Sequence, residues 1–443
     1  MSNDRFPLLF RAARAWIAFW TDRIYYRRTW VEGKDNVPRS GTPVLMVSNH
    51  QQALNDALCL VTTLRDRKPT FLARGDVFSL NRALSAFLRW IGILPAFRLK
   101  IDGAAAMQGN YASFGEAAQR LADGGTVALF PEGKHQEGHW LGDFSTGYLR
   151  IAFGAAEAAG FKKDILVQPV CNHYSEFGGM RHERLVRYGE PLSLAPYYDR
   201  YREHPGDVKK EVNAIIRARV EAMMLNVTCQ DRYAETEFIR KNVYGRHFAE
   251  RLGKNPRRLP EKLDADRELV RRLEETDTSF GIRNLARRIL DAERQMNVPD
   301  RLFDRPPGIW RTILLSLGLI VTLPVALFCM WPSLPSWLIP NHFSDRARGR
   351  MFPGTFLIAL NSLVLLPLAG VLTFAAAWPL TGSFLIAAAW VASFPLLILF
   401  EWYWCAVLGL VQDRICFHLA DHLGNTEEVR RMRKELDAMV GKL

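Results

Sequence analysis

An apolar run passes directly into a polar loop at residues 44–56, Val-Leu-Met-Val-Ser-Asn-His-Gln-Gln-Ala-Leu-Asn-Asp. Four consecutive apolar residues bounded by polar ones are typical of a buried strand. A second apolar run, at 126–130, passes into the loop Pro131-Glu-Gly-Lys134. Ligands of α/β proteins bind at the carboxyl ends of strands. Both loops are therefore candidate parts of one functional site.

Strand-like and helix-like stretches alternate over residues 40–195. The expected strands lie at 44–48, 71–72, 93–98, 126–130, 165–174 and 185–191, and the expected helices follow residue 55 and lie near 79–91, 104–122 and 146–159. Such alternation predicts an α/β domain with a largely parallel sheet, which we place at 36–204.

The N-terminal segment has the pattern of an amphipathic helix. Apolar residues recur at helical spacing over 7–28, with arginines on the other side: Leu9, Ala13, Trp16, Ile17 and Trp20. We expect this helix, within a segment 1–35, to lie in the lipid interface. A helix that packs on the soluble domain is the alternative. Arginines interrupt the apolar residues too early for a cleavable signal peptide.

The second half of the chain changes character. Residues 205–306 are charged and mostly helical in pattern, and predict a helical extension. Residues 312–344 and 351–400 contain no charged residue at all. Because about 20 apolar residues form one transmembrane helix, we expect a membrane region at 307–412 with spans at 354–377 and 384–411.

The first uncharged run has arginines on both sides, and we expect the tail at 413–443 to act as a basic segment because it carries six lysine and arginine residues. The positive-inside rule places all three basic positions in the cytoplasm. We therefore expect a re-entrant hairpin at 312–340, bent at Pro324, Pro332, Pro335 and Pro340. A single crossing that violates the charge bias is the alternative. The protein is thus expected to be integral to the membrane, with its α/β domain and its tail in the cytoplasm.

Charge and cysteine usage narrow the classes of partner. The chain has 443 residues, 58 of them basic and 46 acidic, for a net charge of +12. An excess of this sign favours anionic partners. No finger, helix-turn-helix or RNA-binding signature occurs, so we expect anionic membrane lipids and no nucleic acid. The six cysteines have no paired spacing, which argues against a metal site or disulfides and fits a reducing compartment.

His50 and Asp56 suit the attack of a hydroxyl on an acyl thioester. An alcohol is a weak nucleophile at neutral pH, so a base must take its proton as the new bond forms, which typically contributes about 10²–10⁴-fold. A neighbouring carboxylate would orient the imidazole and stabilise the imidazolium. We therefore predict that His50 and Asp56 are catalytic.

The two loops resemble the motifs of the phospholipid/glycerol acyltransferase family. Its first motif is commonly Asn-His with an aspartate after four intervening residues; here Asn55 holds that position and the aspartate follows as Asp56. Partners three or four apart share a helix face, so this spacing places His50 in the loop and Asp56 in the first turn of the next helix. The longer spacing is similar to that of fungal-type glycerol-3-phosphate and dihydroxyacetone-phosphate acyltransferases and their bacterial relatives. The motifs cover about residues 44–192.

The resemblance implies further substrate-binding residues. The family's second motif looks like residues 71–75 and 93–98 of this chain, so Arg74 and Arg98 are expected to bind the substrate phosphate. The third motif implies that Glu132 accepts hydrogen bonds from the acceptor hydroxyls and that Gly133 lets the backbone approach closely. Lys134 and His135 stand where many members have threonine and arginine. Lys134 keeps a positive charge but loses the bidentate geometry of arginine.

Two other polar features are expected to be structural. His139 and Asp143 are also four apart but follow no apolar strand, and we expect a surface pair there. Glu401 lies among apolar residues, next to an aromatic cluster typical of a membrane interface.

The sequence thus predicts a membrane-bound glycerolipid O-acyltransferase. The acyl donor would be acyl-CoA or acyl carrier protein, and the acceptor glycerol-3-phosphate or a related glycerol phosphate. Acylation of lysophosphatidate or another lysophospholipid is a rival of the same class, and a non-catalytic lipid-binding protein is a rival of another class. No serine, cysteine or lysine accompanies His50 as a nucleophile, so direct transfer is expected, with no cofactor and no metal.

Overall fold

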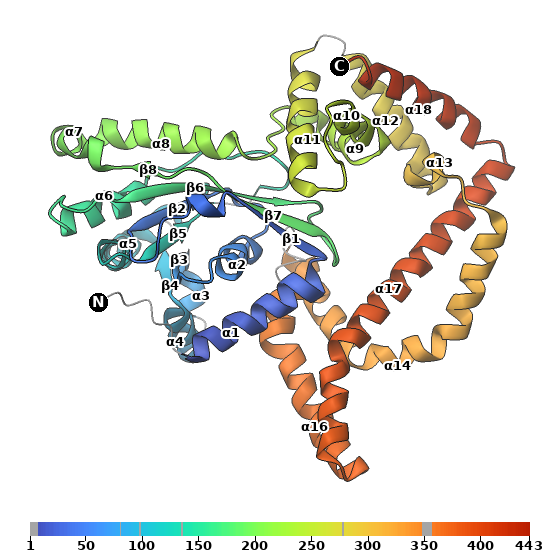
Figure 1. Ribbon diagram of the computed structural model, residues 1–443, viewed down its shortest axis with the longest axis horizontal. Coiled ribbons are helices and arrows are strands. Elements are labelled where there is room, and N and C mark those ends of the chain that lie inside the picture. Colours follow the sequence, from blue (N-terminus) through green and yellow to red (C-terminus); the bar gives the residue numbers. More distant parts are fainter. Residues whose placement is uncertain (1–7, 80, 97–98, 134–135, 277–278, 348–356) are drawn as a thin grey trace. The chain divides into compact units, whose positions relative to one another are not determined.

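The computed structural model describes residues 8–79, 81–96, 99–133, 136–276, 279–347 and 357–443 (Figure 1). The chain divides into two compact units. The first comprises Met1–Met224 with Ala347–Ile358, and the second Leu225–Arg346 with Ala359–Leu443. The α/β domain therefore extends to residue 224, beyond the boundary at 204 that we expected. The reason is that helix α8 (Pro205–Glu221) packs its apolar face on the core of the first unit.

The first unit is built on an eight-stranded sheet, in the order β1-β7-β6-β2-β5-β3-β4 with β8 beside β6. The five strands from β6 to β4 are parallel, whereas β7 and β8 run antiparallel to β6. This confirms the largely parallel sheet. The bounds are β1 Arg28–Glu32, β2 Val44–Ser48, β3 Pro69–Arg74, β4 Ile93–Ala96, β5 Thr126–Leu129, β6 Leu166–Tyr174, β7 Glu183–Tyr188 and β8 Leu192–Ser193.

Helices cover both faces of this sheet. Strand β2 is buried along its whole length and sends Leu45 and Val47 into one core and Val44 and Met46 into the other. This two-residue alternation is what a pleated strand between two layers requires. The first core takes in α5, α6 and α8, and the second takes in α2. The remaining helices of the unit are α1 Leu8–Phe19, α2 Leu54–Thr63, α3 Gly75–Ser79, α4 Arg82–Ile91, α5 Leu99–Ala122, α6 Tyr148–Ala158 and α7 Tyr198–Glu203.

The N-terminal segment differs from the expected single helix over 7–28. Helix α1 continues as a π-helix to Tyr25, and Arg28–Glu32 is strand β1, paired in parallel with β7. The fully buried Arg184 of β7 holds this segment, because its guanidinium pairs with Asp22 and donates to Thr29 at 3.0 Å. Residues 28–35 thus belong to the α/β domain. The membrane contact of α1, whose Leu8 and Leu9 are exposed, stays a prediction.

The second unit is helical. Its core joins α9–α13 to the end of α17 and to α18. The segment 413–443 is therefore no free tail: residues up to His422 continue α17, and the apolar face of α18 is buried in this core. The bounds are α9 Tyr233–Lys241, α10 Val243–Arg251, α11 Leu259–Glu275, α12 Ser279–Met296, α13 Arg301–Asp304, α14 Ile309–Ala347, α16 Leu366–Thr381, α17 Phe384–His422 and α18 Thr426–Val440.

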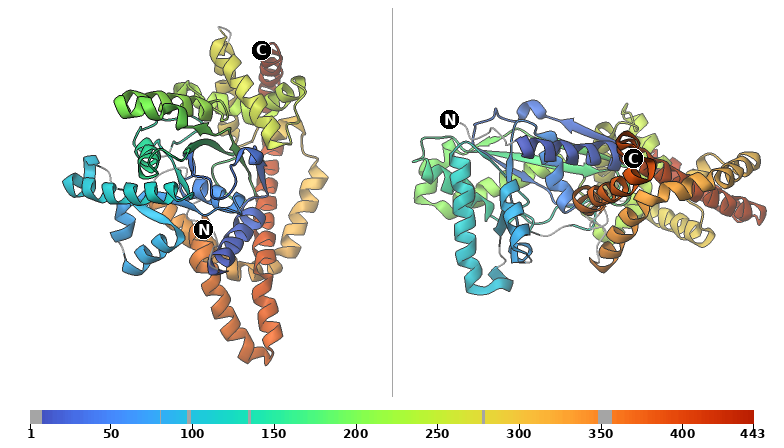
Figure 2. Two further views of the ribbon diagram at one scale, coloured as in Figure 1. Left: turned by 60° about the vertical axis from the view of Figure 1, so that its left-hand side comes forward. Right: turned by 90° about the horizontal axis from the view of Figure 1, so that it is seen from below.

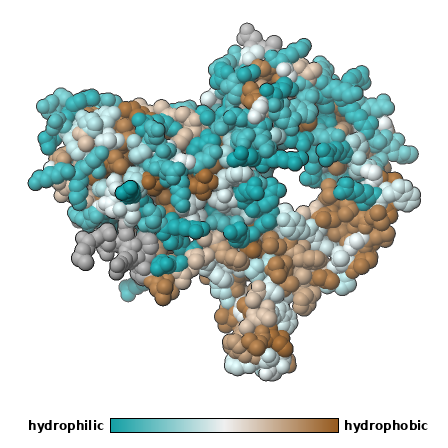
Figure 3. All heavy atoms as spheres, viewed as in Figure 1, coloured by the Kyte–Doolittle hydropathy of each residue, from teal (hydrophilic) through white to brown (hydrophobic). Residues whose placement is uncertain are grey.

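Within the described residues, three helices are long and apolar enough to cross a membrane: Ile309–Pro332 within α14, Leu357–Thr381 and Phe384–His422. Figure 3 shows hydrophobic residues gathered over this part of the molecule. Helices α16 and α17 run side by side in all views and are joined at Gly382, whose φ of +63° ends α16 (Figures 1 and 2). Where we expected a hairpin at 312–340, the chain forms the single helix α14, which contains all four prolines.

A buried acid in the second unit makes its stability depend on pH. Burial, with the charge of Asp300, raises the pKa of Glu293 to about 9. The protonated Glu293 carboxyl lies against Asp300, which accepts from Arg433 at 2.8 and 3.1 Å. Unfolded glutamate ionises near its ordinary value, so the folded state holds a proton that the unfolded chain loses, and folding is progressively disfavoured as the pH rises toward 9.

Glu293→Gln is expected to remove this pH dependence. The free energy of unfolding of the variant, relative to the wild type, should rise by on the order of 1 kcal/mol per pH unit between pH 5 and 9. Thermal unfolding of the full chain in detergent at pH 5, 7 and 9 measures it, with the exposed Glu435→Gln as the control. Parallel curves for wild type and Glu293→Gln would contradict the buried proton.

Candidate active site

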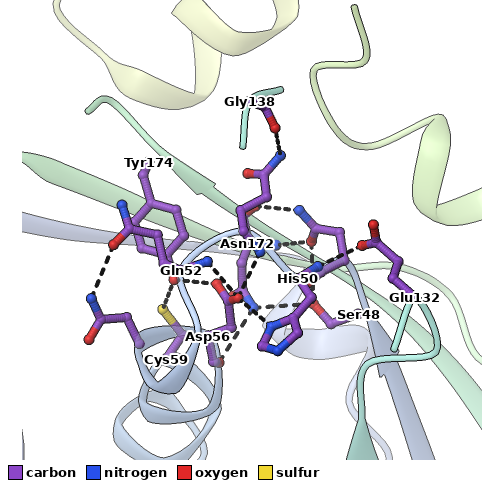
Figure 4. A network of polar contacts seen from close by, with 12 residues as sticks. Ser48, His50, Gln52, Asp56, Cys59, Glu132, Gly138, Asn172 and Tyr174 are labelled. Atoms are coloured by element: carbon purple, nitrogen blue, oxygen red, sulfur yellow. Dashed lines mark hydrogen bonds and ion pairs between the residues drawn. The ribbon is translucent and has the colours of Figure 1, made fainter. Parts of the chain in front are cut away.

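The site is assembled at the carboxyl end of β2. The strand ends at Ser48, residues 49–53 form the loop, and α2 begins at Leu54. His50 therefore lies in the loop and Asp56 in the first turn of α2, as the spacing predicted. Figure 4 shows the two side chains facing each other within one network of polar contacts.

His50 and Asp56 form a pair in which the carboxylate is buried and the imidazole is partly buried. Nδ1 of His50 lies 2.8 Å from Oδ2 of Asp56, and the Asp56 side chain has no exposure to solvent. The same Oδ2 accepts backbone N–H groups of Gln51 and Gln52, each at 2.8 Å. A carboxylate only accepts hydrogen bonds, so Nδ1 carries the hydrogen and the neutral imidazole keeps its basic lone pair at Nε2. The arrangement suits His50 to take up a proton.

Tyr174, at the end of β6, is a further hydrogen-bond donor to Asp56. Its hydroxyl donates to Oδ1 at 2.7 Å. Burial, with the nearby charge of Asp56, raises the pKa of Tyr174 well above its ordinary value. The hydroxyl therefore stays protonated and remains a donor, which fixes the carboxylate from the side opposite His50.

Tyr174→Phe is expected to lower kcat for acyl transfer about tenfold and to leave KM unchanged. A hydrogen bond to a charged group contributes roughly 1.5–3 kcal/mol, and here that bond orients the group that orients His50. Steady-state kinetics test this, with Tyr111→Phe, an exposed tyrosine of the same unit, as the control. An unchanged kcat would show that Tyr174 does not position Asp56.

The loop that carries His50 is tied to β6 by a reciprocal amide contact. The side chain of Asn49 accepts from the backbone N–H of Asn172 at 2.8 Å and donates to its carbonyl at 2.9 Å. The Asn172 side chain donates in turn to Ser48 Oγ at 3.1 Å. Sequence reasoning noted Asn49 only as part of a motif and gave it no role.

The backbone of the loop is strained. Ala53, the residue before α2, has φ +46° and ψ −120°. A non-glycine residue in such a conformation is unfavourable by about 1–3 kcal/mol and persists where the surroundings impose it, often at functional sites. Here the strained turn lies between the two backbone N–H donors and the carboxylate that accepts from them.

Glu132 has a different contact from the one expected. Its Oε1 accepts the backbone N–H of His50 at 2.7 Å, and its Oε2 accepts that of Gly142 at 2.9 Å. Burial raises the pKa of Glu132, and these N–H donors oppose that shift. The His50 ring also stacks on Phe130, with centroids 4.3 Å apart. In this structure Glu132 thus positions His50, whereas we expected it to face acceptor hydroxyls.

Of the four other predicted binding residues, two lie within the described part of the chain. Gly133 is exposed and has φ +66°, a left-handed conformation that favours glycine. Arg74 ends β3, is exposed and pairs with Asp76. Because β3 and β2 are separated only by β5, Arg74 lies at the same edge of the sheet as His50, roughly 10 Å away by strand spacing. Arg98 and Lys134 lie outside the described residues.

The expected surface pair at His139 and Asp143 is wrong. Asp143 is exposed, but His139 is completely buried and its ring lies 5.3 Å from that of His173 and 4.6 Å from that of Phe177. The loop that carries it folds back on the site, since the backbone N–H of Gln136 donates to the carbonyl of His50 at 3.2 Å. A glycine-rich loop without a preceding strand gave no signal of this burial.

The arrangement can accept a proton at His50 and hold the resulting charge against Asp56. No group of three or more His, Cys, Asp or Glu side chains that suits a metal ion occurs among the described residues.

The chain is similar to known acyltransferases over part of its length. No curated protein matches the chain. Among solved structures it is similar to the 1-acyl-sn-glycerophosphate (LPA) acyltransferase, PlsC, from Thermotoga maritima, with 15% identity and a TM-score of 0.34, over 48% of this chain and 80% of that one. Residues 28–173, which run from β1 into β6 and carry His50, Asp56 and Glu132, match the family model described as Acyltransferase.

Proposed function

We propose that this protein is a membrane-bound glycerolipid O-acyltransferase. It transfers a fatty acyl group from acyl-CoA or acyl carrier protein to glycerol-3-phosphate or a related glycerol phosphate. The observation that supports this most is the contact of 2.8 Å between His50 Nδ1 and Asp56 Oδ2 within the segment that matches the acyltransferase model.

The pair supports direct transfer between the two substrates. His50 Nε2 removes the proton of the acceptor hydroxyl as its oxygen attacks the thioester carbonyl, and Asp56 stabilises the imidazolium that forms. When the tetrahedral intermediate collapses, the C–S bond breaks and the thiolate leaves. The imidazolium then returns the proton to the thiolate, so that His50 is neutral again at the end of the cycle.

The neighbouring nucleophilic side chains are poorly suited to form an acyl-enzyme. Cys59 contacts the Tyr174 hydroxyl at 3.4 Å, but burial raises the pKa of its thiol to about 11, so it carries little thiolate at neutral pH. Ser48 Oγ is engaged with Asn49 and with the Asn172 side chain (Figure 4). These contacts favour a ternary complex of donor and acceptor over a covalent intermediate.

Arg74 is proposed to bind the acceptor phosphate together with Arg98 and Lys134. Arg74→Gln is expected to raise KM for the phosphorylated acceptor about tenfold, because one charge-assisted contact to phosphate is lost, and to leave KM for the acyl donor unchanged. Arg65→Gln, at another exposed arginine of the same unit, is the matched control. Equal KM values for Arg74→Gln and wild type would remove Arg74 from the binding site.

The membrane region is proposed to cross an even number of times. Arg301, ahead of α14, pairs with Asp413 of α17, and Phe303 contacts Phe417 with centroids 5.5 Å apart. The start of α14 and the end of α17 therefore lie on one side of a membrane. With three apolar helices among the described residues, an even number of crossings requires that one of them does not span the membrane. Basic flanks favour the cytoplasm for this side and for the catalytic unit.

An acceptor panel tests the proposed function. Purified full chain would receive a labelled acyl-CoA or acyl carrier protein with glycerol-3-phosphate, dihydroxyacetone phosphate or lysophosphatidate in turn. The proposal predicts labelled product with a glycerol phosphate. Product with lysophosphatidate alone would assign the lysophospholipid reaction, and the absence of product with every pair would favour the non-catalytic lipid-binding protein.

A further inference from the structure

A second candidate site lies in the helical unit. A pocket of about 1060 Å³ is lined by α10, the loop at 256–257, the segment at 301–306 and α18. Its lining includes eight lysine and arginine side chains and three carboxylates, those of Glu250, Asp304 and Asp437. The pocket is therefore predominantly basic, and nothing in the proposed acyl transfer uses it.

Ion pairs fix several side chains of this lining. The guanidinium of Arg433 pairs with both Asp300 and Asp304 and lies over the ring of Phe303 at 5.4 Å. Arg246 also pairs with Asp304. Arg433 is held by two carboxylates and Arg246 by one, so both guanidiniums already have partners and shape the pocket rather than attract a ligand.

Three cations of the lining are not neutralised. Arg257, Arg305 and Lys434 are exposed, and within the described part of the chain none of them has a carboxylate partner. Among the described residues, two lining carboxylates have no lysine or arginine partner: Glu250, and Asp437, which contacts the His247 ring. Three unpaired cations against two such carboxylates leave an excess of positive charge that favours an anion, and two of the cations are guanidiniums, whose fork of donors matches phosphate oxygens.

The pocket lies next to the ends of the apolar parts of α14 and α17, where charged residues begin. Arg305 precedes Ile309, the start of the first apolar helix, by four residues. On the other side, Asp413 is the first charged residue after Glu401 in α17 and pairs with Arg301 of the lining. For helices that enter a bilayer, this level is the headgroup region, where basic pockets meet anionic lipid.

We propose that this pocket binds the phosphate group of an anionic phospholipid. The shared chemistry is a phosphate ester held by Arg257, Arg305 and Lys434, and a lipid is favoured over a free phosphate by the adjoining apolar helices.

Binding to the full chain in neutral detergent tests the proposal. The probes are dioctanoyl phosphatidylglycerol, dioctanoyl phosphatidylcholine and inorganic phosphate, none of which is a proposed acyl acceptor. The pocket variant is R257Q/R305Q/K434Q, and the control R267Q/R294Q/K442Q removes the same charge from residues outside the lining. Phosphatidylglycerol should bind saturably, on the order of 100-fold more weakly to the pocket variant, because each basic residue contributes about fivefold. Affinity for the control variant should stay within about twofold of wild type.

The outcomes separate the sources of phosphate. Binding of inorganic phosphate that is as tight as that of phosphatidylglycerol and is lost in the pocket variant would support the phosphate site with a free ligand. Equal weakening in both variants would overturn the proposal, since bulk charge would explain it. Binding of phosphatidylcholine as tight as that of phosphatidylglycerol would also overturn it. No outcome depends on acyl-transfer activity.

Discussion

Replacing His50 with alanine is expected to lower the rate of acyl transfer by about 10²–10⁴-fold, the usual contribution of a general base. Three contacts hold His50: Asp56 contacts Nδ1 of its ring, Glu132 accepts the backbone N–H of His50, and the Phe130 ring stacks on the imidazole. Each contact fixes where Nε2 points, and alanine removes the lone pair that takes the hydroxyl proton. Initial rates with saturating acyl-CoA and glycerol-3-phosphate measure the loss.

The control for this variant is His204→Ala, because His204 is an exposed histidine of the same unit. Its rate should equal that of the wild type. The thermal midpoint of His50→Ala should stay near the wild-type value, since Glu132 contacts the backbone of residue 50 and that contact survives the substitution. A folded His50→Ala protein with full activity would remove His50 from the chemistry.

Asp56→Asn is expected to lower kcat by about 10²–10⁴-fold while KM for both substrates changes little. The amide keeps the size of the carboxylate but lacks its charge, so the imidazolium is no longer stabilised and the tautomer with hydrogen on Nδ1 is no longer enforced. Four donors converge on this carboxylate: His50, Tyr174 and two backbone N–H groups. Comparison of kcat and KM for wild type and variant is the measurement.

Asp56→Asn also weakens buried hydrogen bonds and can unfold the loop. A second variant separates this effect from the loss of charge. Tyr174→Phe removes a donor to the same carboxylate but leaves its charge, and its loss of about tenfold should be much smaller than that of Asp56→Asn. If the two variants lose activity equally while both remain folded, the charge of Asp56 is not what supports the reaction.

The sheet was predictable because its central strands are buried on both faces. Such strands occur as uninterrupted apolar runs, and Val44–Ser48 and Thr126–Leu129 appear within one residue of the expected limits. The spacing of His50 and Asp56 likewise predicted a loop residue and a first-turn residue. Both inferences rest on neighbours in the chain.

The contacts that hold the site were not predictable, because they join residues far apart in sequence. Asn49 meets Asn172 and Asp56 meets Tyr174 only because β6 lies beside β2 in the sheet. The order of strands does not follow from their individual patterns. The same reason applies to Glu132, whose motif indicated a functional residue but not its two backbone partners.

The prediction of a tail at 413–443 was also wrong. Residues 426–440 are rich in charge of both signs and look like a solvated tail, yet they form α18, whose Leu436 and Val440 are fully buried. Helical spacing places these apolar residues on one face, but only the helical core of the second unit supplies the surface that covers it.

A single-turnover experiment tests the role of the His50–Asp56 pair most directly. Enzyme in excess over labelled acyl-CoA would be mixed with glycerol-3-phosphate, quenched in acid, and its label divided among thioester, denatured protein and lipid. Wild type should pass the label from thioester to lipid with none on the protein, and His50→Ala should leave it on the thioester. Label trapped on wild-type protein, or equally fast lipid formation by His50→Ala, would contradict direct transfer with His50 as the base.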